Sequence, residues 1–210
     1  MGFDILSAIV IGCVLFIKNA VGVLQTPYET CRKLASGERL EQLLPLGFLT
    51  VAYFGWSVLV RQGVRAHPML LTYSMGTLLF ASFGTFFLVI ATLVVVGRLF
   101  RGTGSFRTVI LLWGYSMLPT VMWFWITSVL WIVYPPPRTD SFTGQMLSAV
   151  FLIVSLFLFF WKGVLYYLTL RLGMRLDLLK ILGVTAVVFP LGGLYALIMY
   201  TLGIFRVPFI

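Results

Sequence analysis

Apolar residues gather into five long runs, and the short stretches between the runs carry most of the charges. A helix needs about 20 residues to cross a hydrocarbon layer of about 30 Å, and each run has about this length or more. We therefore predict an all-α fold, a polytopic membrane helix bundle with five transmembrane helices. The predicted spans lie at about 43–60, 69–97, 108–134, 145–170 and 179–204.

The second and third runs are longer than a straight crossing requires, so tilted or kinked helices are expected there. Residues that break helices occur in the third run at Pro119 and in the fifth run at Pro190, Gly192 and Gly193. We expect bends at these positions, since neighbouring helices can satisfy the freed backbone groups. A proline-rich loop, Pro135-Pro136-Pro137, separates the third run from the fourth.

Residues 1–25 form a further apolar segment whose core, 3–24, is just long enough to cross a bilayer as a helix. At 100° per residue its polar positions fall in one narrow stripe, made of Asp4, Ser7, Lys18, Gly22 and Gln25. The stripe favours an amphipathic helix in the cytoplasmic interface, or a re-entrant one. A sixth span is the alternative. The segment lacks the basic start and the cleavage site of a secretory signal.

Residues 26–42 begin with a strong signal for a helix start. Thr26 suits the N-cap, Pro27 suits the first helical position, and Glu29 can complete a capping box by reaching back to the Thr26 amide. Gly37 is expected to end this helix. We predict a short basic helix on the cytoplasmic membrane surface, followed by the five-span domain at 43–210.

The composition supports the membrane class and fixes an orientation. Of the 210 residues 60% are hydrophobic and 10% charged, too apolar for a water-soluble domain. The net charge of +9 reflects the positive-inside bias rather than nucleic-acid binding. One predicted side carries ten basic residues: Lys18, Arg32, Lys33, Arg39, Arg98, Arg101, Arg107, Arg171, Arg175 and Lys180. The other side carries four: Arg61, Arg65, Arg138 and Arg206. Residues 26–42 should therefore be cytoplasmic and the C-terminus external.

Few residues in the chain suit catalysis. His67 is the single histidine, which excludes a histidine metal cluster and disfavours a Ser-His-Asp unit. The predicted spans hold no carboxylate, so proton-coupled transport and paired-carboxylate hydrolysis lose support. Cys13 lies in an apolar run and Cys31 in a basic stretch, so no disulfide or metal role is expected. We expect a non-enzymatic protein without a cofactor.

Two features are candidates for contact with anionic lipids. The loop at 98–107 combines glycines with Arg98, Arg101 and Arg107. It can cradle a lipid phosphate, or it can be a tight turn whose arginines follow the positive-inside rule. Lys162 is the only charge well inside a predicted span. Its side chain can snorkel to the head groups, or it can bind an anionic lipid or substrate within the membrane.

Small residues at Thr77, Ala81 and Thr85 recur at every fourth position of the second span. Such a line lets another helix approach closely. The approaching helix can belong to the same chain, which we favour, or to a second copy.

The segment Gly114-Tyr115-Ser116-Met117-Leu118-Pro119 resembles the Gly-Tyr-x-Leu/Met-Leu-Pro element of the Yip-domain family, the five-span Ypt/Rab-interacting membrane proteins. Pro27 and Glu29 resemble the Pro-x-Glu-Thr lead-in of prokaryotic members, and residues 102–106 resemble their Gly-x-Gly-Ser-Phe turn. The chain lacks the long polar N-terminal region and the Asp-Leu-Tyr-Gly-Pro motif of eukaryotic members. The resemblance thus implies a short prokaryotic-type member of a plasma membrane and disfavours Rab binding.

The motif also has a bottom-up interpretation. Pro119 cannot donate to the Tyr115 carbonyl, which Ser116 or Thr120 can partly satisfy, and Gly114 leaves room beside the resulting kink. The motif is therefore either an element that shapes the bundle, which we favour, or part of a binding site.

The resemblance and the scarcity of catalytic groups together favour a membrane scaffold or adaptor. Such a protein would organise membrane lipids, anionic ones above all, or partner proteins. The rival interpretation is a small permease or lipid-translocating protein, with a cavity lined by the third and fifth spans.

Overall fold

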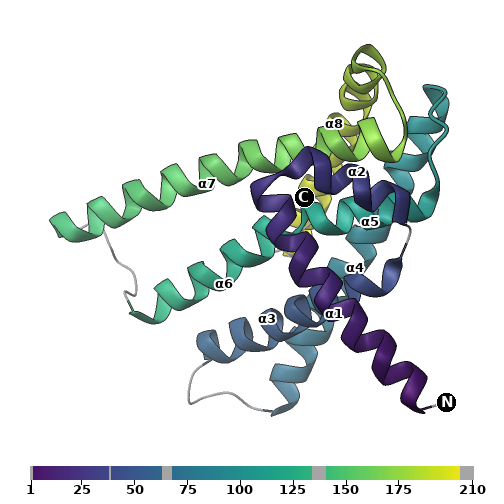
Figure 1. Ribbon diagram of the computed structural model, residues 1–210. Helices are drawn as coiled ribbons and strands as arrows, with labels where there is room; N and C mark the ends of the chain where they lie inside the picture. The colour runs from purple at the N-terminus through teal and green to yellow at the C-terminus, as the bar shows by residue number, and fades with distance from the viewer. Residues whose placement is uncertain (1, 38, 63–67, 134–140, 204–210) are drawn as a thin grey trace.

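A computed structural model of the chain describes residues 2–37, 39–62, 68–133 and 141–203. Every regular element in these ranges is a helix, which confirms the all-α prediction (Figure 1). The elements are α1 (Gly2–Gln25), α2 (Pro27–Gly37), the 3-10 helix η1 (Leu40–Leu43), α3 (Leu44–Gln62), α4 (Pro68–Leu99), α5 (Phe106–Ser116), α6 (Leu118–Val133), α7 (Phe142–Leu168), the π-helical turn η3 (Thr169–Gly173) and α8 (Leu178–Thr201).

Five helical segments are long and apolar enough to cross a membrane, as the sequence predicts. They are Leu40–Val60, Met75–Leu99, Phe106–Leu130, Phe142–Gly173 and Leu178–Thr201. The apolar helix α1 is not among these five, because the part of it with described side chains, Val10–Gln25, is shorter than a candidate span. With 32 residues, α4 is about 48 Å long, more than the thickness of a hydrocarbon layer, so it must tilt or extend past the membrane.

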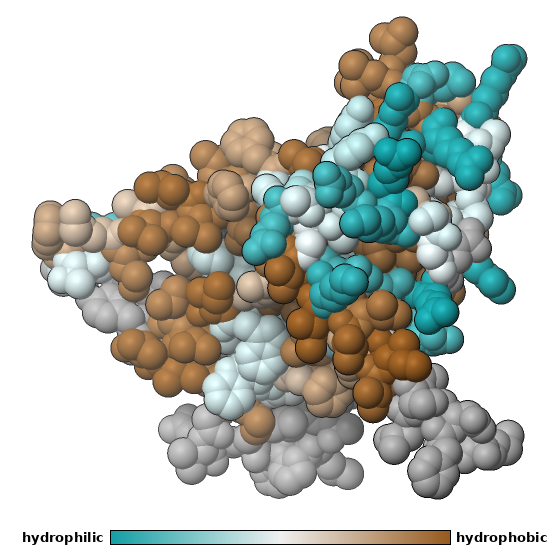
Figure 2. Space-filling view, viewed as in Figure 1, coloured by the Kyte–Doolittle hydropathy of each residue, from teal (hydrophilic) through white to brown (hydrophobic). Residues whose placement is uncertain are grey.

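The surface of the molecule separates into an apolar part and a polar end. Leu152, Phe159 and Phe160 on α7 are 70%, 67% and 64% exposed, a pattern expected for contact with lipid. Hydrophilic residues gather instead over α2 and the adjoining turns, while α6 and α7 are covered by hydrophobic ones (Figure 2). This division places the polar end at a membrane surface.

Helix α5 is the centre of the bundle. Eight of its eleven residues are buried, and α2, α4, α7, η1 and η3 pack around it. The buried core extends from α5 into α1, α4, α7 and α8. The segment that contains the Gly-Tyr motif is thus the most enclosed part of the described chain.

The third span bends where α5 passes into α6. Met117 separates the two helices, and its amide donates to the Gly114 carbonyl at 3.0 Å. Pro119 is the second residue of α6, where a missing N–H costs no helical hydrogen bond. The Ser116 hydroxyl donates to the Trp113 carbonyl at 2.7 Å, so it does not satisfy the Tyr115 carbonyl as expected. Helix α8, in contrast, continues through Pro190.

One face of α1 packs against the segments that follow it in the chain. A Cβ atom at Gly22 would lie 2.6 Å from the Thr30 hydroxyl, and one at Gly12 would lie 3.1 Å from the Glu41 carbonyl oxygen. Gly22 thus allows α1 and α2 to approach closely. The opposite face of α1 is apolar and exposed, with Ile17 63% exposed.

The buried amide of Gln42 connects three segments of the chain. Its Oε1 atom accepts hydrogen bonds from the Tyr115 hydroxyl at 3.0 Å and from the Asn19 side chain at 2.7 Å. Its Nε2 atom donates to the Arg39 carbonyl at 2.7 Å. Gln42 is 4% exposed and Tyr115 is fully buried, so water does not compete for these bonds. The network joins α1, η1 and α5.

We expect Tyr115→Phe to lower the free energy of unfolding by about 1 kcal/mol, because it removes one hydrogen bond while Asn19 still satisfies Gln42. Gln42→Leu should cost more, since the Tyr115 hydroxyl would stay buried without an acceptor. Thermal unfolding in detergent micelles measures both. Tyr28→Phe, at the 54% exposed Tyr28 of α2, is the control. Equal stability of the Gln42 and Tyr28 variants would contradict this role.

Candidate functional site

Two turns at the polar end of the bundle dock against each other. The first, residues 100–105, connects α4 to α5, and the second, residues 174–177, connects η3 to α8. The Thr103 amide donates to the Met174 carbonyl at 3.1 Å. The Ser105 hydroxyl then caps α5 by accepting from the Thr108 amide at 3.1 Å. We call residues 98–107 and 171–180 together the paired turns.

Glycines make this docking possible. A Cβ atom at Gly104 would overlap the Gly173 carbonyl, and one at Gly102 would lie 3.0 Å from the Met174 carbonyl oxygen. Gly97 also faces the second turn, where its Cβ atom would lie 2.7 Å from the Cε atom of the Met174 side chain. The Gly-x-Gly element is therefore a backbone contact between two turns.

Arg101 lies just after the end of α4 and has a left-handed backbone conformation, with φ of 63°. The Gly102 amide donates to the Gly97 carbonyl, and the Arg101 amide donates to the Arg98 carbonyl, each at 2.9 Å. These two bonds form a Schellman motif, in which the left-handed position usually holds glycine.

Arg175 occupies the same kind of position in the second turn, with φ of 56°. The Leu176 and Met174 amides both donate to the Leu170 carbonyl, at 3.3 and 3.2 Å. A left-handed conformation costs a residue with a side chain about 1 to 2 kcal/mol. The exposed side chains of Arg101 and Arg175 are thus kept in neighbouring turns at a cost to stability. Arg101 is a candidate predicted from the sequence. Arg175 is not, because its role depends on the docking of the two turns.

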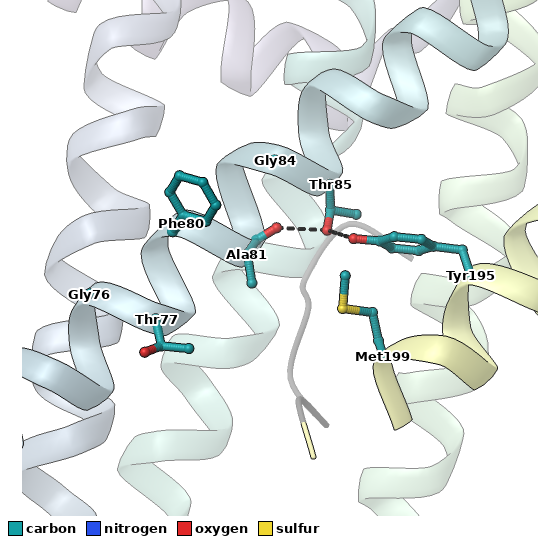
Figure 3. Close-up of a pocket in the computed structure, with 8 residues that line it drawn as sticks. All are labelled: Gly76, Thr77, Phe80, Ala81, Gly84, Thr85, Tyr195 and Met199. Carbon is teal, nitrogen blue, oxygen red and sulfur yellow. Dashed lines mark hydrogen bonds between the residues drawn. The ribbon is translucent and has the colours of Figure 1, made fainter. Parts of the chain in front are cut away.

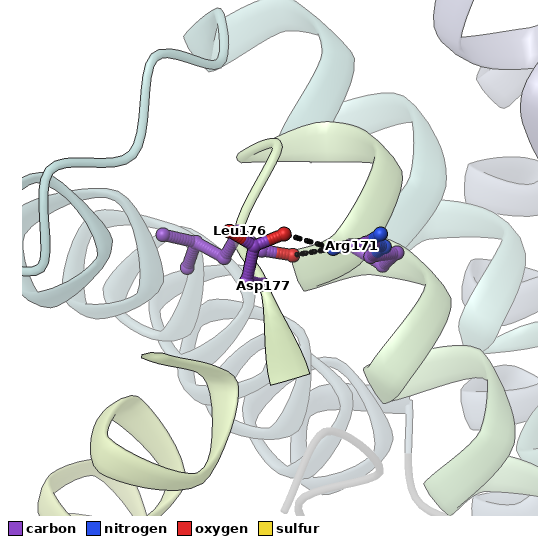
Figure 4. Close-up of polar contacts among 3 residues, drawn as sticks. All are labelled: Arg171, Leu176 and Asp177. Carbon is purple, nitrogen blue, oxygen red and sulfur yellow. Dashed lines mark hydrogen bonds and ion pairs between the residues drawn. The ribbon is translucent and has the colours of Figure 1, made fainter. Parts of the chain in front are cut away.

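Arg171 holds the second turn together (Figure 4). Its guanidinium donates to the Asp177 carboxylate at 2.6 Å and to the Leu176 carbonyl at 2.9 Å. The ion pair is exposed and so contributes little to stability. It does occupy the carboxylate of Asp177. In the described ranges no ion pair is formed by Arg101 or Arg175.

The other candidate arginines border the same site. Arg98 near the end of α4 and Arg107 near the start of α5 are both exposed. Large apolar residues stand beside them, with Leu99 75% and Leu179 81% exposed. Cations next to exposed apolar side chains are typical of a protein surface that lies in the head-group region of a membrane.

The predicted capping box is not formed. Helix α2 does begin at Pro27, but the Thr26 amide donates to the Gly22 carbonyl at 2.7 Å rather than to Glu29. Only Thr26 separates α2 from α1, and the last turn of α1 supplies the acceptor. Cys31 on α2 is buried, which raises its pKa to about 12 and keeps the thiol protonated. Cys31 and Cys13 are free, as expected.

The Gly-Tyr motif packs inside the protein. A Cβ atom at Gly114 would lie 2.6 Å from the Leu43 side chain, Tyr115 binds Gln42, and Pro119 is buried. These contacts favour the interpretation of the motif as an element that shapes the bundle.

The line of small residues on α4 faces α8 of the same chain (Figure 3). The Thr85 hydroxyl donates to the Ala81 carbonyl at 2.7 Å and therefore accepts from the Tyr195 hydroxyl at 2.6 Å. Beyond this contact the two helices leave a groove of about 480 Å³, lined by Gly76, Thr77, Phe80, Ala81, Gly84, Thr85, Tyr195 and Met199. The approaching helix is thus within the chain.

The remaining candidate from the sequence is Lys162, which is half-buried and whose ammonium lies over the Trp113 ring.

His67 and the loop Pro135-Pro136-Pro137 lie outside the described residues. Within the described residues there is no group of three or more metal-binding side chains.

The bundle and its paired turns define a class of protein: a multi-pass, all-α membrane protein with a compact polar end. The model of the family described as the Yip1 domain matches residues 5–200, so the chain belongs to that family. Members of this family are generally non-enzymatic. No curated protein and no solved structure matches the chain.

Gly104→Ala should prevent the paired turns from docking, because the added methyl group would overlap the Gly173 carbonyl. We expect a loss of stability of about 2 kcal/mol or more, the range for overpacked sites. Gly47→Ala is the matched control, since its Cβ atom would meet open space within a helix, and it should leave stability equal or slightly higher. Limited proteolysis at the turns and thermal unfolding report both effects. Similar behaviour of the two variants would refute the docking.

Proposed function

We propose that this protein is a non-enzymatic membrane scaffold that gathers anionic lipids at its paired turns. The observation that carries the proposal is the left-handed conformation of Arg101 and Arg175. Glycine would be more stable at both positions, so the arginine side chains must contribute something other than stability. Their exposed charge, which no carboxylate neutralises in the described residues, is that contribution.

The geometry of the turns supports the collective action of several charges. Arg98, Arg101, Arg107, Arg175 and Lys180 are all exposed on the paired turns. A basic residue near an anionic membrane surface gains about 1 kcal/mol. Because hydrogen bonds and glycine contacts hold the two turns together, the charges can act on the same patch of lipid. Anionic head groups gathered there would, in turn, attract basic partner proteins.

We further propose that the paired turns face the cytoplasm of a prokaryotic cell, because basic residues are concentrated there. Thr103→Cys, in a background with Cys13 and Cys31 replaced by Ser, tests the orientation. A membrane-impermeant maleimide should label this variant in inverted vesicles and not in intact cells. Labelling in intact cells alone would reverse the proposed orientation.

A second candidate function is supported by the groove between α4 and α8. Its volume of about 480 Å³ and its largely apolar lining suit a lipid chain in transit. Purified protein in liposomes should show background lipid scrambling and solute flux if it is only a scaffold. Robust scrambling that is lost in Gly84→Leu, which fills the groove, would replace the scaffold with a lipid-translocating protein.

The double variant Arg101→Gly/Arg175→Gly tests the scaffold directly. It should unfold at a higher temperature, because both left-handed positions gain the preferred residue. It should also lose anionic-lipid enrichment, by about fivefold for each arginine, if each charge contributes about 1 kcal/mol. Energy transfer from the protein to fluorescent phosphatidylglycerol in proteoliposomes, compared with fluorescent phosphatidylcholine, measures the enrichment.

Lys18→Gln is the control for a general charge effect, since Lys18 is exposed on α1 and outside the paired turns. It should retain most of the enrichment. An unchanged enrichment in the double variant, or an equal loss in Lys18→Gln, would refute the proposal.

A further inference from the structure

Lys162 and Trp113 face each other below the polar end of the bundle. Lys162 is six residues before the end of α7, and Trp113 is seven residues after the start of α5. At 1.5 Å per residue these positions are about 9 and 10 Å from the helix ends. Both helices belong to candidate membrane spans. The two side chains therefore lie within candidate membrane spans, about two helical turns from the ends that face the polar end of the bundle.

The Lys162 ammonium is stabilised only in part by the protein. Its Nζ atom lies 5.9 Å from the centre of the Trp113 ring, within range of a cation–π interaction. Helices α5, α6, α7 and α8 contain no Asp or Glu, and Lys162 forms no ion pair with the residues that the structure describes. A cation at this depth is costly without a counter-ion.

Beside Lys162, the indole N–H of Trp113 is a hydrogen-bond donor that lacks an acceptor. Trp113 is 5% exposed, and its Nε1 atom has no hydrogen-bond partner in the described protein. The neighbouring hydroxyl of Tyr166 donates to Thr185 at 3.1 Å and forms no hydrogen bond with the indole N–H. Buried donors of this kind usually have a partner, and each such exception calls for an explanation.

We propose that Lys162 and Trp113 bind the phosphate group of an anionic phospholipid between α5 and α7. A phosphate has only acceptors to offer, so it satisfies the ammonium and the indole N–H together. Nε1 belongs to the ring that the ammonium overlies, and Nε1 is buried, so the proposed phosphate lies between α5 and α7 rather than on the outer surface of either helix. This site is separate from the paired turns and does not depend on them.

The surroundings favour a lipid over a soluble phosphate. Lys162 is only half-buried, so a ligand can reach it from the side of the bundle. On the same helix Phe159, three residues before Lys162 and so on a neighbouring part of the helix surface, is 67% exposed and offers an apolar surface along which an acyl chain can lie. A lipid whose phosphate sits this deep would press its chains against α7.

Native mass spectrometry of the full chain, released from membranes of phosphatidylglycerol and phosphatidylcholine, tests the site. The wild type should retain phosphatidylglycerol selectively. Lys162→Gln should retain it about tenfold less, as expected when a charged hydrogen bond worth about 1.4 kcal/mol is lost. Lys162→Arg should restore retention, because it keeps the charge and the donors. Trp113→Phe, which keeps an aromatic ring but removes the N–H, should show an intermediate loss.

Lys33→Gln is the matched control, since Lys33 is an exposed lysine on α2, and it should retain lipid like the wild type. Wild-type retention in Lys162→Gln, equal loss in Lys33→Gln, or no preference over phosphatidylcholine would overturn the proposal. If Lys162→Gln does not fold, as judged by circular dichroism, wild-type retention in Trp113→Phe would overturn it instead.

Two further arms identify the source of the phosphate and separate this site from the paired turns. Millimolar inorganic phosphate should not displace the retained lipid, and displacement would overturn the assignment to a lipid in favour of a soluble phosphate. Arg101→Gly/Arg175→Gly should retain the lipid bound at Lys162. A loss in this double variant equal to that in Lys162→Gln would show that retention depends on the paired turns and would overturn the separate site.

Discussion

The buried amide of Gln42 is the interaction on which the arrangement of this bundle depends. Inside a membrane protein an amide side chain is costly unless both its oxygen and its nitrogen are satisfied. Here they are satisfied by the neighbouring Arg39 carbonyl and by Asn19 and Tyr115, which belong to distant parts of the chain. The network therefore fixes how α1 and η1 lie against α5. Since α4, α7 and η3 also pack on α5, the network connects α1 and η1 to the helix at the centre of the bundle.

The polar end is organised by a different kind of contact. Glycines let two backbones meet where side chains would keep them apart, and arginines are then held in conformations that glycine usually adopts. At Arg101 and Arg175 the protein is less stable than it would be with glycine, but it carries two more positive charges. Such a loss of stability is expected at surfaces that have a function. Lys162 presents a related case within the bundle, because its ammonium is only partly stabilised by its neighbours.

Periodicity and length were enough to predict the five spans, since a hydrocarbon layer requires long apolar helices. The start of α2 at Pro27 and the bend near Pro119 also follow from local chemistry. Contacts between distant segments could not be predicted in this way. Gln42 appears in the sequence as one polar residue of a short connection, Gly22 as part of a polar stripe, and Arg175 as one more positive charge. Each has a role only because folding places a partner beside it. The capping box failed for the same reason, as α1 supplies an acceptor that Glu29 could not compete with.

The docking of the two turns also affects how this part of the chain can change. Connections at the surface of a protein usually tolerate insertions, and they vary more in length than the helices they join. In residues 100–105 a single added residue would move Gly102 and Gly104 away from the carbonyls they face. The length of this connection is thus as constrained as the interior of a helix. A fusion tag or a foreign epitope would be better placed elsewhere.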